Sequence, residues 1–397
     1  MKLLHFLFHK DHFLIIVLAV LVMLLLTVIT FTIPMFSPIT KALKNISATD
    51  LFFQVENKFK IAEKCQDIVI VDMTELHSRS DIGQLLSDIY DAHPKAIGVD
   101  LIFEGVKDDI EEDLALEKVV EKIAPITIFA NKLVDYDASE KKFRGCVMSY
   151  FKDLYSIDEG YTNLDDNMEH SVVRNTTVSQ ATIFGKQLSF PVKLAFKSGI
   201  NHVEQSGSIT IDFHPVKIPV LAFDQVKKKQ NLLKGKVVLV GAMKEEQDCH
   251  LSPLGKMSGI ELQAYSLLTL MKHKSYRLAS KYVSILIAVL LCYVYELFLS
   301  VIAIFVRTRK LRMRIFLSES RILLTFFPML FFSSISIMAF LLFDIWDISV
   351  DMVIILVMLS MVGFSRRLYW AFKKLINGSL KFEITAKRLY AASQRVL

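Results

Sequence analysis

The sequence predicts an α/β domain combined with membrane-spanning helices. Three short apolar stretches predict the central sheet of this domain, at residues 67–72, 95–103 and 236–241. Each stretch is rich in β-branched residues, and each is followed by a polar segment that can form a helix. Continuously apolar strands that alternate with helices are typical of a mainly parallel or mixed sheet whose faces are both covered by helices.

The hydrophobic residues are distributed unevenly along the chain. They make up 53% of the 397 residues and are concentrated in the first 33 residues and in the last third. Such a distribution indicates membrane spans rather than one large core. The net charge of +6 is small for this length, and much of it lies in short loops beside the apolar runs. The charge therefore favours membrane orientation and excludes nucleic acid as an expected partner.

Four apolar segments are long enough to cross a bilayer as helices. They are residues 13–33, 281–306, 322–343 and 348–364. A cleaved signal peptide is the alternative for the first segment, because a basic start precedes it. Its apolar core is too long for that alternative and no small-x-small cleavage site follows, so we expect an uncleaved anchor.

Charged loops predict the orientation of the spans. The loop at 307–321 and the tail at 365–397 are basic, whereas the turn at 344–347 and the residues after it are acidic. Basic loops stay in the cytoplasm. Residues 1–12, 307–321 and 365–397 are therefore expected inside, and residues 34–280 and 344–347 outside. In the tail, Asn377-Gly378 is expected to end one basic helix before a second short helix begins.

Within residues 34–280, apolar spacing and breaker residues predict alternating elements. Residues 135–177 are rich in Asp, Ser, Tyr and Gly and are expected to form long loops and hairpins. The helices are expected at 54–64, 81–93, 108–123, 190–198 and 258–272, and the strands at 67–73, 96–103, 126–130, 209–213 and 236–241.

No pattern in the sequence points to a catalytic or metal site. There is no Gly-rich phosphate loop, no G-x-S-x-G elbow, no H-E-x-x-H motif and no kinase signature. Cys65, Cys146, Cys249 and Cys292 are not spaced as zinc or iron–sulfur ligands. One disulfide among the first three and inert buried thiols both remain open. The protein is therefore expected to be no enzyme and to carry no cofactor or metal.

Five stretches of the middle region resemble a known family, the type 2 CHASE domains (cyclase/histidine-kinase-associated sensory extracellular domains). The resemblance covers residues 34–280, and one span before the domain and three after it fit the family plan. The stretches are Ile68-Val-Ile-Val-Asp-Met-Thr-Glu75, Ala92-His-Pro-Lys-Ala-Ile-Gly-Val-Asp-Leu-Ile-Phe-Glu104, Leu233-Lys-Gly-Lys-Val-Val-Leu-Val-Gly-Ala242 with Asp248 and Pro253, Met257-Ser-Gly-Ile-Glu-Leu-Gln-Ala264, and the weaker Val172-Val-Arg174.

The chain departs from the family pattern in two places. A tryptophan–proline pair usual after the first strand is replaced by His77-Ser-Arg-Ser-Asp81. Family members commonly carry a cyclase, kinase or other output domain after the last span, whereas this chain ends 33 residues after Phe364. The resemblance thus implies a standalone sensor in the bacterial inner (cytoplasmic) membrane that acts through a separate effector protein.

Three aspartates are the candidate ligand-binding residues of the outer domain. Asp72, Asp100 and Asp248 follow predicted strands or lie in the loop after one, and they would converge at one sheet edge if the strands are parallel neighbours. One interpretation is a ligand or cation pocket, because hard cations prefer oxygen ligands. The other is that each carboxylate caps the turn or helix that follows it.

Glu296 is the one ionisable residue deep within a predicted span. Burial of a carboxylate in a bilayer costs about 2.5 kcal/mol or more. Glu296 should therefore face another helix, with Tyr293 or Ser333, Ser334 or Ser336 as candidate partners. We assign it to signal transfer or assembly, and passive pairing near the membrane surface is the alternative. The same role is assigned to four arginines of the inner loop: Arg307, Arg309, Arg312 and Arg314.

Three functions remain open at this point. The first is a sensor or receptor subunit that signals through a separate membrane or cytoplasmic effector. The second is a non-signalling assembly or scaffold subunit, which an exposed aromatic face on residues 135–177 without a pocket would favour. The third is a cell-envelope enzyme, which would need a paired acid and base. Membrane lipids, the effector and a second copy of the chain are the expected partners.

Overall fold

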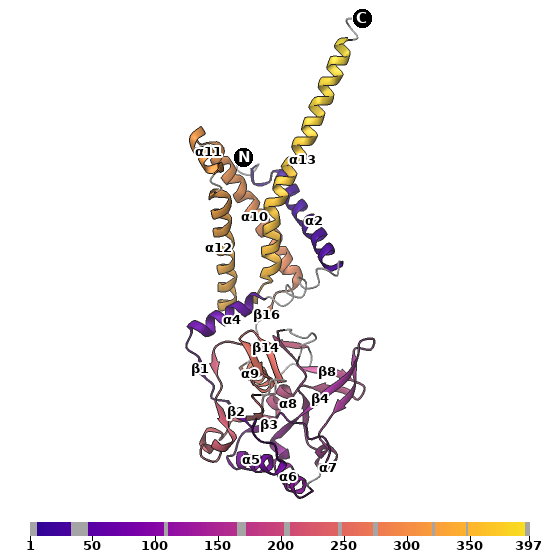
Figure 1. The fold of residues 1–397 in the computed structure, drawn as a ribbon, viewed down its shortest axis with the longest axis vertical. Coiled ribbons are helices and arrows are strands. Elements are labelled where there is room, and N and C mark those ends of the chain that lie inside the picture. The colour runs from indigo at the N-terminus through magenta and orange to yellow at the C-terminus, as the bar shows by residue number, and fades with distance from the viewer. Residues whose placement is uncertain are drawn as a thin grey trace. The chain divides into compact units, whose positions relative to one another are not determined.

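The computed structural model describes residues 6–32, 47–106, 110–164, 172–201, 207–244, 248–272, 277–319, 322–346 and 348–393. The chain forms two compact units (Figure 1). One unit, residues 49–277, contains the strands of the predicted α/β domain. The other, residues 1–48 with 278–397, contains the long apolar helices.

The main sheet has nine strands among the described residues of the first unit. Its strand order is β12-β2-β13-β3-β4-β5-β8-β9, and β6 also pairs with β4. The pairs from β12 to β4 are parallel, whereas β4–β5 and β8–β9 are antiparallel hairpins. The strands are β2 (Ile68–Asp72), β3 (Ala96–Val99), β4 (Thr127–Asp137), β5 (Lys142–Val147), β6 (Glu159–Tyr161), β8 (Ser179–Thr182), β9 (Gly185–Leu188), β12 (Val220–Ala222) and β13 (Val237–Gly241).

Helices cover both faces of the parallel part of this sheet. Alternate residues of a strand point to opposite faces, so Val69 and Val71 of β2 join one core and Ile68 and Ile70 join the other. The first core is covered by α5 (Arg79–Asp91) and α6 (Ile110–Ile123), and the second by α8 (Phe190–Lys197) and α9 (Gly259–Lys272). The predicted α/β fold with a mixed sheet and flanking helices is confirmed.

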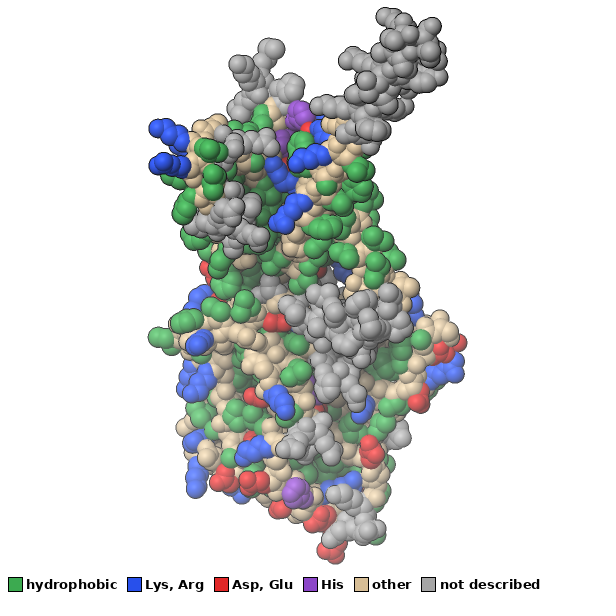
Figure 2. Space-filling view, turned by 45° about the horizontal axis from the view of Figure 1, so that its top comes forward, with side chains coloured by type: hydrophobic (Ala, Val, Ile, Leu, Met, Phe, Trp, Pro, Cys, Tyr) green, Lys and Arg blue, Asp and Glu red, His purple; other side chains and the backbone are tan. Residues whose placement is uncertain are grey.

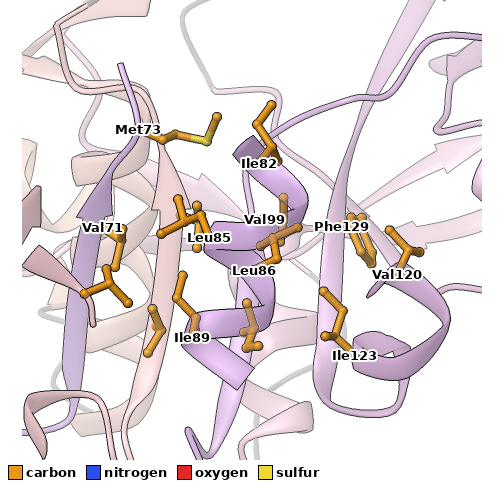
Figure 3. Packing of buried hydrophobic residues seen from close by; sticks show 14 of the residues in the cluster. Val71, Met73, Ile82, Leu85, Leu86, Ile89, Val99, Val120, Ile123 and Phe129 are labelled. Carbon is orange, nitrogen blue, oxygen red and sulfur yellow. The ribbon is translucent and has the colours of Figure 1, made fainter. Parts of the chain in front are cut away.

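The first core shows why residues 79–91 form a helix against the sheet. Figure 3 shows Ile82, Leu85, Leu86 and Ile89 of α5 pointing toward Val71 and Val99 of the strands. The spacing of these four residues places them on one face of a helix. Ser78 caps the helix by accepting a hydrogen bond from the Asp81 amide at 3.0 Å. Burial of this apolar face thus attaches α5 to the sheet.

The remaining elements of the first unit are short, with the exception of α4 (Ala48–Phe59). It is the first helix of the unit, and it ends before residue 60, where the sequence had predicted a helix over 54–64. The others are β1 (Glu63–Lys64), the 3₁₀ turns η2 (Ala124–Ile126), η3 (Phe223–Gln225) and η4 (Gln230–Leu232), α7 (Phe151–Tyr155), β7 (Asn175–Thr177), β10 (Ser208–Thr210), β11 (Val216–Lys217), β14 (Cys249–Ser252), β15 (Gly255–Ser258) and β16 (Arg277–Leu278).

The second unit contains, among its described residues, four helices long and apolar enough to cross a membrane. They are α2 (Lys10–Thr32), α10 (Lys281–Arg307), α12 (Ile322–Trp346) and α13 (Met352–Ser393), joined by the shorter α11 (Leu311–Glu319) and β17 (Ile348–Ser349). Hydrophobic side chains cover broad areas of these helices (Figure 2). The chain is therefore a multi-pass membrane protein.

Two predicted boundaries in this unit are wrong. The last spanning helix begins at Met352 rather than at residue 348, because Ile348–Ser349 is extended. Asn377-Gly378 does not end a helix, since α13 runs without a break from Met352 to Ser393. A glycine inside a helix costs only about 1 kcal/mol relative to alanine, which is less than the cost of interrupting the hydrogen-bond ladder.

Replacement of Leu86 by alanine should remove side-chain contacts from the centre of the first core. Leu86 is fully buried, so we expect L86A to lower the free energy of unfolding of the α/β unit by about 2–5 kcal/mol. Chemical denaturation of the full chain in lipid nanodiscs measures the change. L114A on neighbouring α6 is the control, because Leu114 is exposed and its truncation should change the free energy by less than about 0.5 kcal/mol.

Candidate functional site

The structure separates the three candidate aspartates into two places. The strands β2 and β3 are parallel, as expected, but β13 lies between them. Asp72 pairs in register with Gly241 of β13, and Asp100 follows the last residue of β3. Two strand spacings amount to about 10 Å, so Asp72 and Asp100 lie at the same sheet edge without being direct neighbours.

Asp72 organises the turn after β2. Its Oδ1 accepts hydrogen bonds from the Thr74 amide at 3.0 Å and from the Thr74 hydroxyl at 2.5 Å. The Thr74 hydroxyl in turn accepts hydrogen bonds from the amides of Met243 and Lys244 at 3.0 and 3.2 Å. The loops after β2 and β13 are thereby joined, so the capping role that was one of the two interpretations is present at Asp72.

Asp72 also lines a cavity of about 170 Å³ at the carboxyl ends of β2 and β12. This is the position at which open α/β sheets bind ligands. Lys244 approaches the free Oδ2 of Asp72 at 3.9 Å and Phe223 supplies an apolar wall. The cavity lining is Asp72, Thr74, Glu75, Ala222, Phe223, Asp224 and Lys244, which does not include Asp100 or Asp248. The carboxylates at this opening suit a small ligand with a cationic group.

The other two candidate aspartates, Asp100 and Asp248, lie close enough for their charges to interact. Removal of Asp100 from water, together with the nearby charge of Asp248, raises the pKa of the Asp100 carboxyl from 3.8 to about 7. Asp248 accepts a hydrogen bond from the Gly259 amide at 3.2 Å, where α9 begins. A Cβ at residue 259 would lie 2.6 Å from that carboxylate, so a larger residue there would require the Asp248 side chain to shift. His250 Nε2 lies 3.4 Å from Asp248.

The intramembrane carboxylate has partners that the sequence analysis did not predict. Glu296 is fully buried on α10, and its Oε1 accepts hydrogen bonds from Arg366 Nη1 of α13 and from the Ser300 hydroxyl at 3.2 Å. His12 Nδ1 of α2 lies 3.3 Å from the same oxygen. Glu296 therefore contacts two other helices.

A second ion pair lies close along the same helices. Asp11 of α2 accepts hydrogen bonds from the Tyr369 hydroxyl at 2.7 Å and from Lys373 Nζ at 2.6 Å, both on α13. We refer to these residues as the polar cluster: Asp11, His12, Glu296, Ser300, Arg366, Tyr369 and Lys373. The cluster joins α2, α10 and α13, and each carboxylate is matched by one arginine or lysine.

The predicted partners of Glu296 are wrong. Tyr293 donates its hydroxyl hydrogen bond to the Leu7 carbonyl. Ser333, Ser334 and Ser336 are exposed on α12, and the last two donate to carbonyls of their own helix. Arg366 after the last span and Glu296 within the second span were visible in the sequence, but only a common membrane level would have suggested that they pair.

Two of the four arginines of the inner loop have described side chains, and neither is part of the polar cluster. Arg309 and Arg312 are exposed, and the Arg309 guanidinium lies 4.0 Å from the centroid of the Phe305 ring. Arg307 and Arg314 lie on α10 and α11, and their side chains are outside the described residues.

Two further questions from the sequence concern thiols and metals. All four cysteines are free thiols, so the disulfide alternative is not realised. The described residues contain no group of three or more His, Cys, Asp or Glu side chains that could hold a metal ion. The strand-end carboxylates therefore do not assemble into a single cation site.

The sequence of the chain matches a known family. The model of the CHASE2 domain matches residues 16–298 of the chain. The chain belongs to the CHASE2 family. CHASE2 domains are sensory rather than catalytic, so this chain is a membrane-bound sensor protein. The match extends from within α2 to within α10 and includes Glu296 and all of the strand-end aspartates. No curated protein and no solved structure matches the sequence.

The raised pKa of Asp100 predicts a pH-dependent stability. The folded state holds the Asp100 proton more tightly than the unfolded state, so the stability is fully present below about pH 4 and is lost as the pH rises toward about 7. At pH 8 this loss in the free energy of unfolding amounts to up to about 4 kcal/mol. We expect D100N not to show it, because the asparagine side chain does not titrate. Denaturation of the full chain between pH 5 and 8 measures the slope, and D67N at the exposed opposite end of β2 is the control. Equal slopes in D100N and the parent protein would contradict this assignment.

Removal of the Glu296 carboxylate should destabilise the helical unit. E296A leaves the guanidinium of Arg366 without its carboxylate partner, which typically costs about 3–5 kcal/mol for a buried pair. Thermal unfolding in nanodiscs, followed by helix circular dichroism, measures the loss. R367A is the matched control, because Arg367 is the exposed neighbour of Arg366. A midpoint for E296A equal to that of R367A would show that the polar cluster contributes no stability.

Proposed function

We propose that the protein is an extracytoplasmic sensor subunit of the bacterial inner membrane that signals through a separate effector protein. Residues 34–280 face the outside in this proposal, and both termini face the cytoplasm. The basic loop at 307–321 and the basic residues after residue 364 support this orientation, since such loops stay inside. Ligands enter the outer domain at the strand-end cavity beside Asp72.

The observation that carries the proposal is the position of the polar cluster. The outer domain is connected through the chain to two helices, because α2 precedes α4 and α10 follows α9. The polar cluster binds both of these helices to α13 through His12, Glu296 and Arg366. A change in the position of α2 relative to α10 therefore acts on the Glu296 carboxylate, which also binds α13.

A continuous helix provides the route from the cluster to the inside. Beyond Lys373, α13 continues as far as Ser393 without a break. Displacement or rotation of its spanning half is therefore transmitted to its last two turns, where an effector reads it. A ligand shifts this equilibrium only by its difference in affinity for the two states. The exposed Arg309 and Arg312 provide additional cationic contacts for anionic lipids or for the effector.

One observation favours a scaffold as the second candidate function. Tyr136 is 54% exposed at the β4–β5 hairpin, and its ring lies 4.9 Å from that of Phe143. Ile183 and Phe184 at the β8–β9 turn are also exposed. These residues offer a protein-binding surface on the outer domain. The cavity beside Asp72 nevertheless distinguishes this domain from a scaffold without a pocket, so we rank sensing first.

Affinity capture from gently solubilised membranes tests the proposal. We expect the full chain to capture a cytoplasmic effector and a variant lacking residues 379–397 to lose it. This truncation keeps Arg366, Tyr369 and Lys373, so the polar cluster remains intact. The variant K374A is the control for a loss of positive charge alone. Capture of envelope proteins only, unchanged by the truncation, would contradict signalling and support the scaffold.

A further inference from the structure

A second cavity of the outer domain, of about 230 Å³, lies beside α4 and contains a histidine between two carboxylates. Glu56 of α4 provides one carboxylate, and Asp212 in the loop after β10 provides the other. Thr269 and Lys272 of α9 complete the wall. The side chain of Glu56 is 4% exposed, whereas that of His214 is 32% exposed and is open to water in the cavity.

His214 contacts both carboxylates through different ring nitrogens. Its Nδ1 is hydrogen-bonded to Asp212 Oδ1, and its Nε2 lies 3.4 Å from Glu56 Oε2. The amide of His214 also donates to Asp212 Oδ1 at 3.0 Å. A neutral imidazole has one N–H, whereas an imidazolium has two. Only the protonated ring can therefore offer a hydrogen to both carboxylates.

Among the described residues that line the floor of the cavity, the charges balance only when His214 is protonated. Glu56 Oε1 is paired with Lys60 Nζ at 2.5 Å, which compensates one carboxylate. The carboxylate of Asp212 is compensated by the imidazolium. When the ring is neutral, the buried carboxylate of Glu56 and the partly buried carboxylate of Asp212 share one ammonium group. An uncompensated buried charge is costly, so loss of the proton weakens the contact between α4 and the loop.

Other charged groups around His214 do not replace this proton. Lys272 of α9 lies 4.0 Å from Glu63 of β1, at the exposed rim of the cavity. The pKa of Tyr265 on α9 is raised to about 12 by burial and by the charges of Glu261 and Asp212, so this phenol stays neutral. The rings of Phe52 and Phe53 pack edge-on against the imidazole. Among the described residues that line this cavity, His214 is the one whose side-chain type changes charge at physiological pH.

The helix held by this contact is the one that follows the first membrane span. Its other attachments do not depend on a proton near neutral pH. Asn57 donates to the Phe213 carbonyl at 2.9 Å, and Gln54 donates to the Pro253 carbonyl at 3.0 Å. Arg174 binds Asp50 through two hydrogen bonds of 2.8 and 2.5 Å. Of the α4 contacts described here, the His214 contact is therefore the one whose strength changes with protonation near neutral pH.

We propose that His214 is a proton-binding site that fastens α4 to the outer domain, so that the proton is a ligand of this sensor. Protonation of the ring at low pH joins Glu56 to Asp212 and strengthens the docking of α4. Deprotonation at higher pH releases the Glu56 carboxylate, and the docking of α4 weakens. Because α4 is the next described helix after the first span, this step names a stimulus for the sensor and in that respect rests on the proposed function.

Hydrogen–deuterium exchange of the full chain in lipid nanodiscs tests the proton site. Protection factors, corrected for the intrinsic rate at each pH, are compared at pH 5.5 and pH 8.0 for peptides of α4 and α5. We expect the α4 protection to fall about tenfold or more at pH 8.0 relative to α5, as the loss of a buried charge partner predicts. In H214Q, the α4 protection should be low at both pH values.

Two further variants keep the test decisive. E56Q leaves the fold of the loop untouched and should also remove the pH response, because one carboxylate is then left for the ring to bind. D100N should retain the response, since Asp100 titrates in the same pH range but is not among the residues that line this cavity. If H214Q lowers the protection of the reference helix α5 as well, the substitution has disturbed the fold more widely. The result for E56Q then decides whether the proposal stands. An α4 response that is absent in the parent chain, or that persists in both H214Q and E56Q, overturns the proposal.

Effector capture at the two pH values separates this inference from the proposed function. A pH response of α4 without any captured effector would support the proton site and contradict signalling in trans. Effector capture that is lost on truncation, together with α4 protection that does not change with pH, would support signalling and overturn the proton site.

Discussion

The cost of placing a carboxylate inside a bilayer constrains the whole helical unit. Glu296 is fully buried at a level where water does not compensate its charge. Arg366 from α13 and His12 from α2 must therefore approach it, and their approach fixes how three of the four spanning helices pack. Cys292 and Tyr295 on the same helix pack into the apolar core beside this ion pair. The remaining span, α12, contacts the others through aromatic side chains such as Phe331.

The outer domain is governed by a different constraint, the pairing of its strands. β13 lies between β2 and β3 and is buried along its whole length. Its insertion places the Asp72 turn beside β12, where a cavity forms, and brings Asp100 close to Asp248. One strand thus divides the polar sheet edge into the cavity beside Asp72 and the carboxylate pair of Asp100 and Asp248. The two halves are suited to different tasks, ligand binding and a contribution of pH to stability.

Short-range patterns in the sequence predicted the elements but not their partners. The strands predicted at 67–73 and 236–241 and the helix predicted at 81–93 depend on local periodicity, and the structure contains all three as β2, β13 and α5, with slightly different ends. The four spans follow from length and apolarity alone. By contrast, the strand order and the partners of Glu296 depend on which distant segments meet. The role of His214 was missed for the same reason, since Glu56 lies 158 residues away and joins it only through tertiary folding.

The central position of β13 has a consequence for how the protein is made. The ribosome delivers β2 and β3 first, but these strands do not pair with each other, and their common neighbour follows only after residues 100–236 have been synthesised. Contacts that span so much sequence form slowly because a long loop must close first. In an extracytoplasmic orientation, β2 and β3 cross the membrane before β13, so the edge that each strand offers to β13 stays unpaired until residue 241 has emerged. During translocation the nascent domain therefore depends on whatever shields these two strands in the envelope.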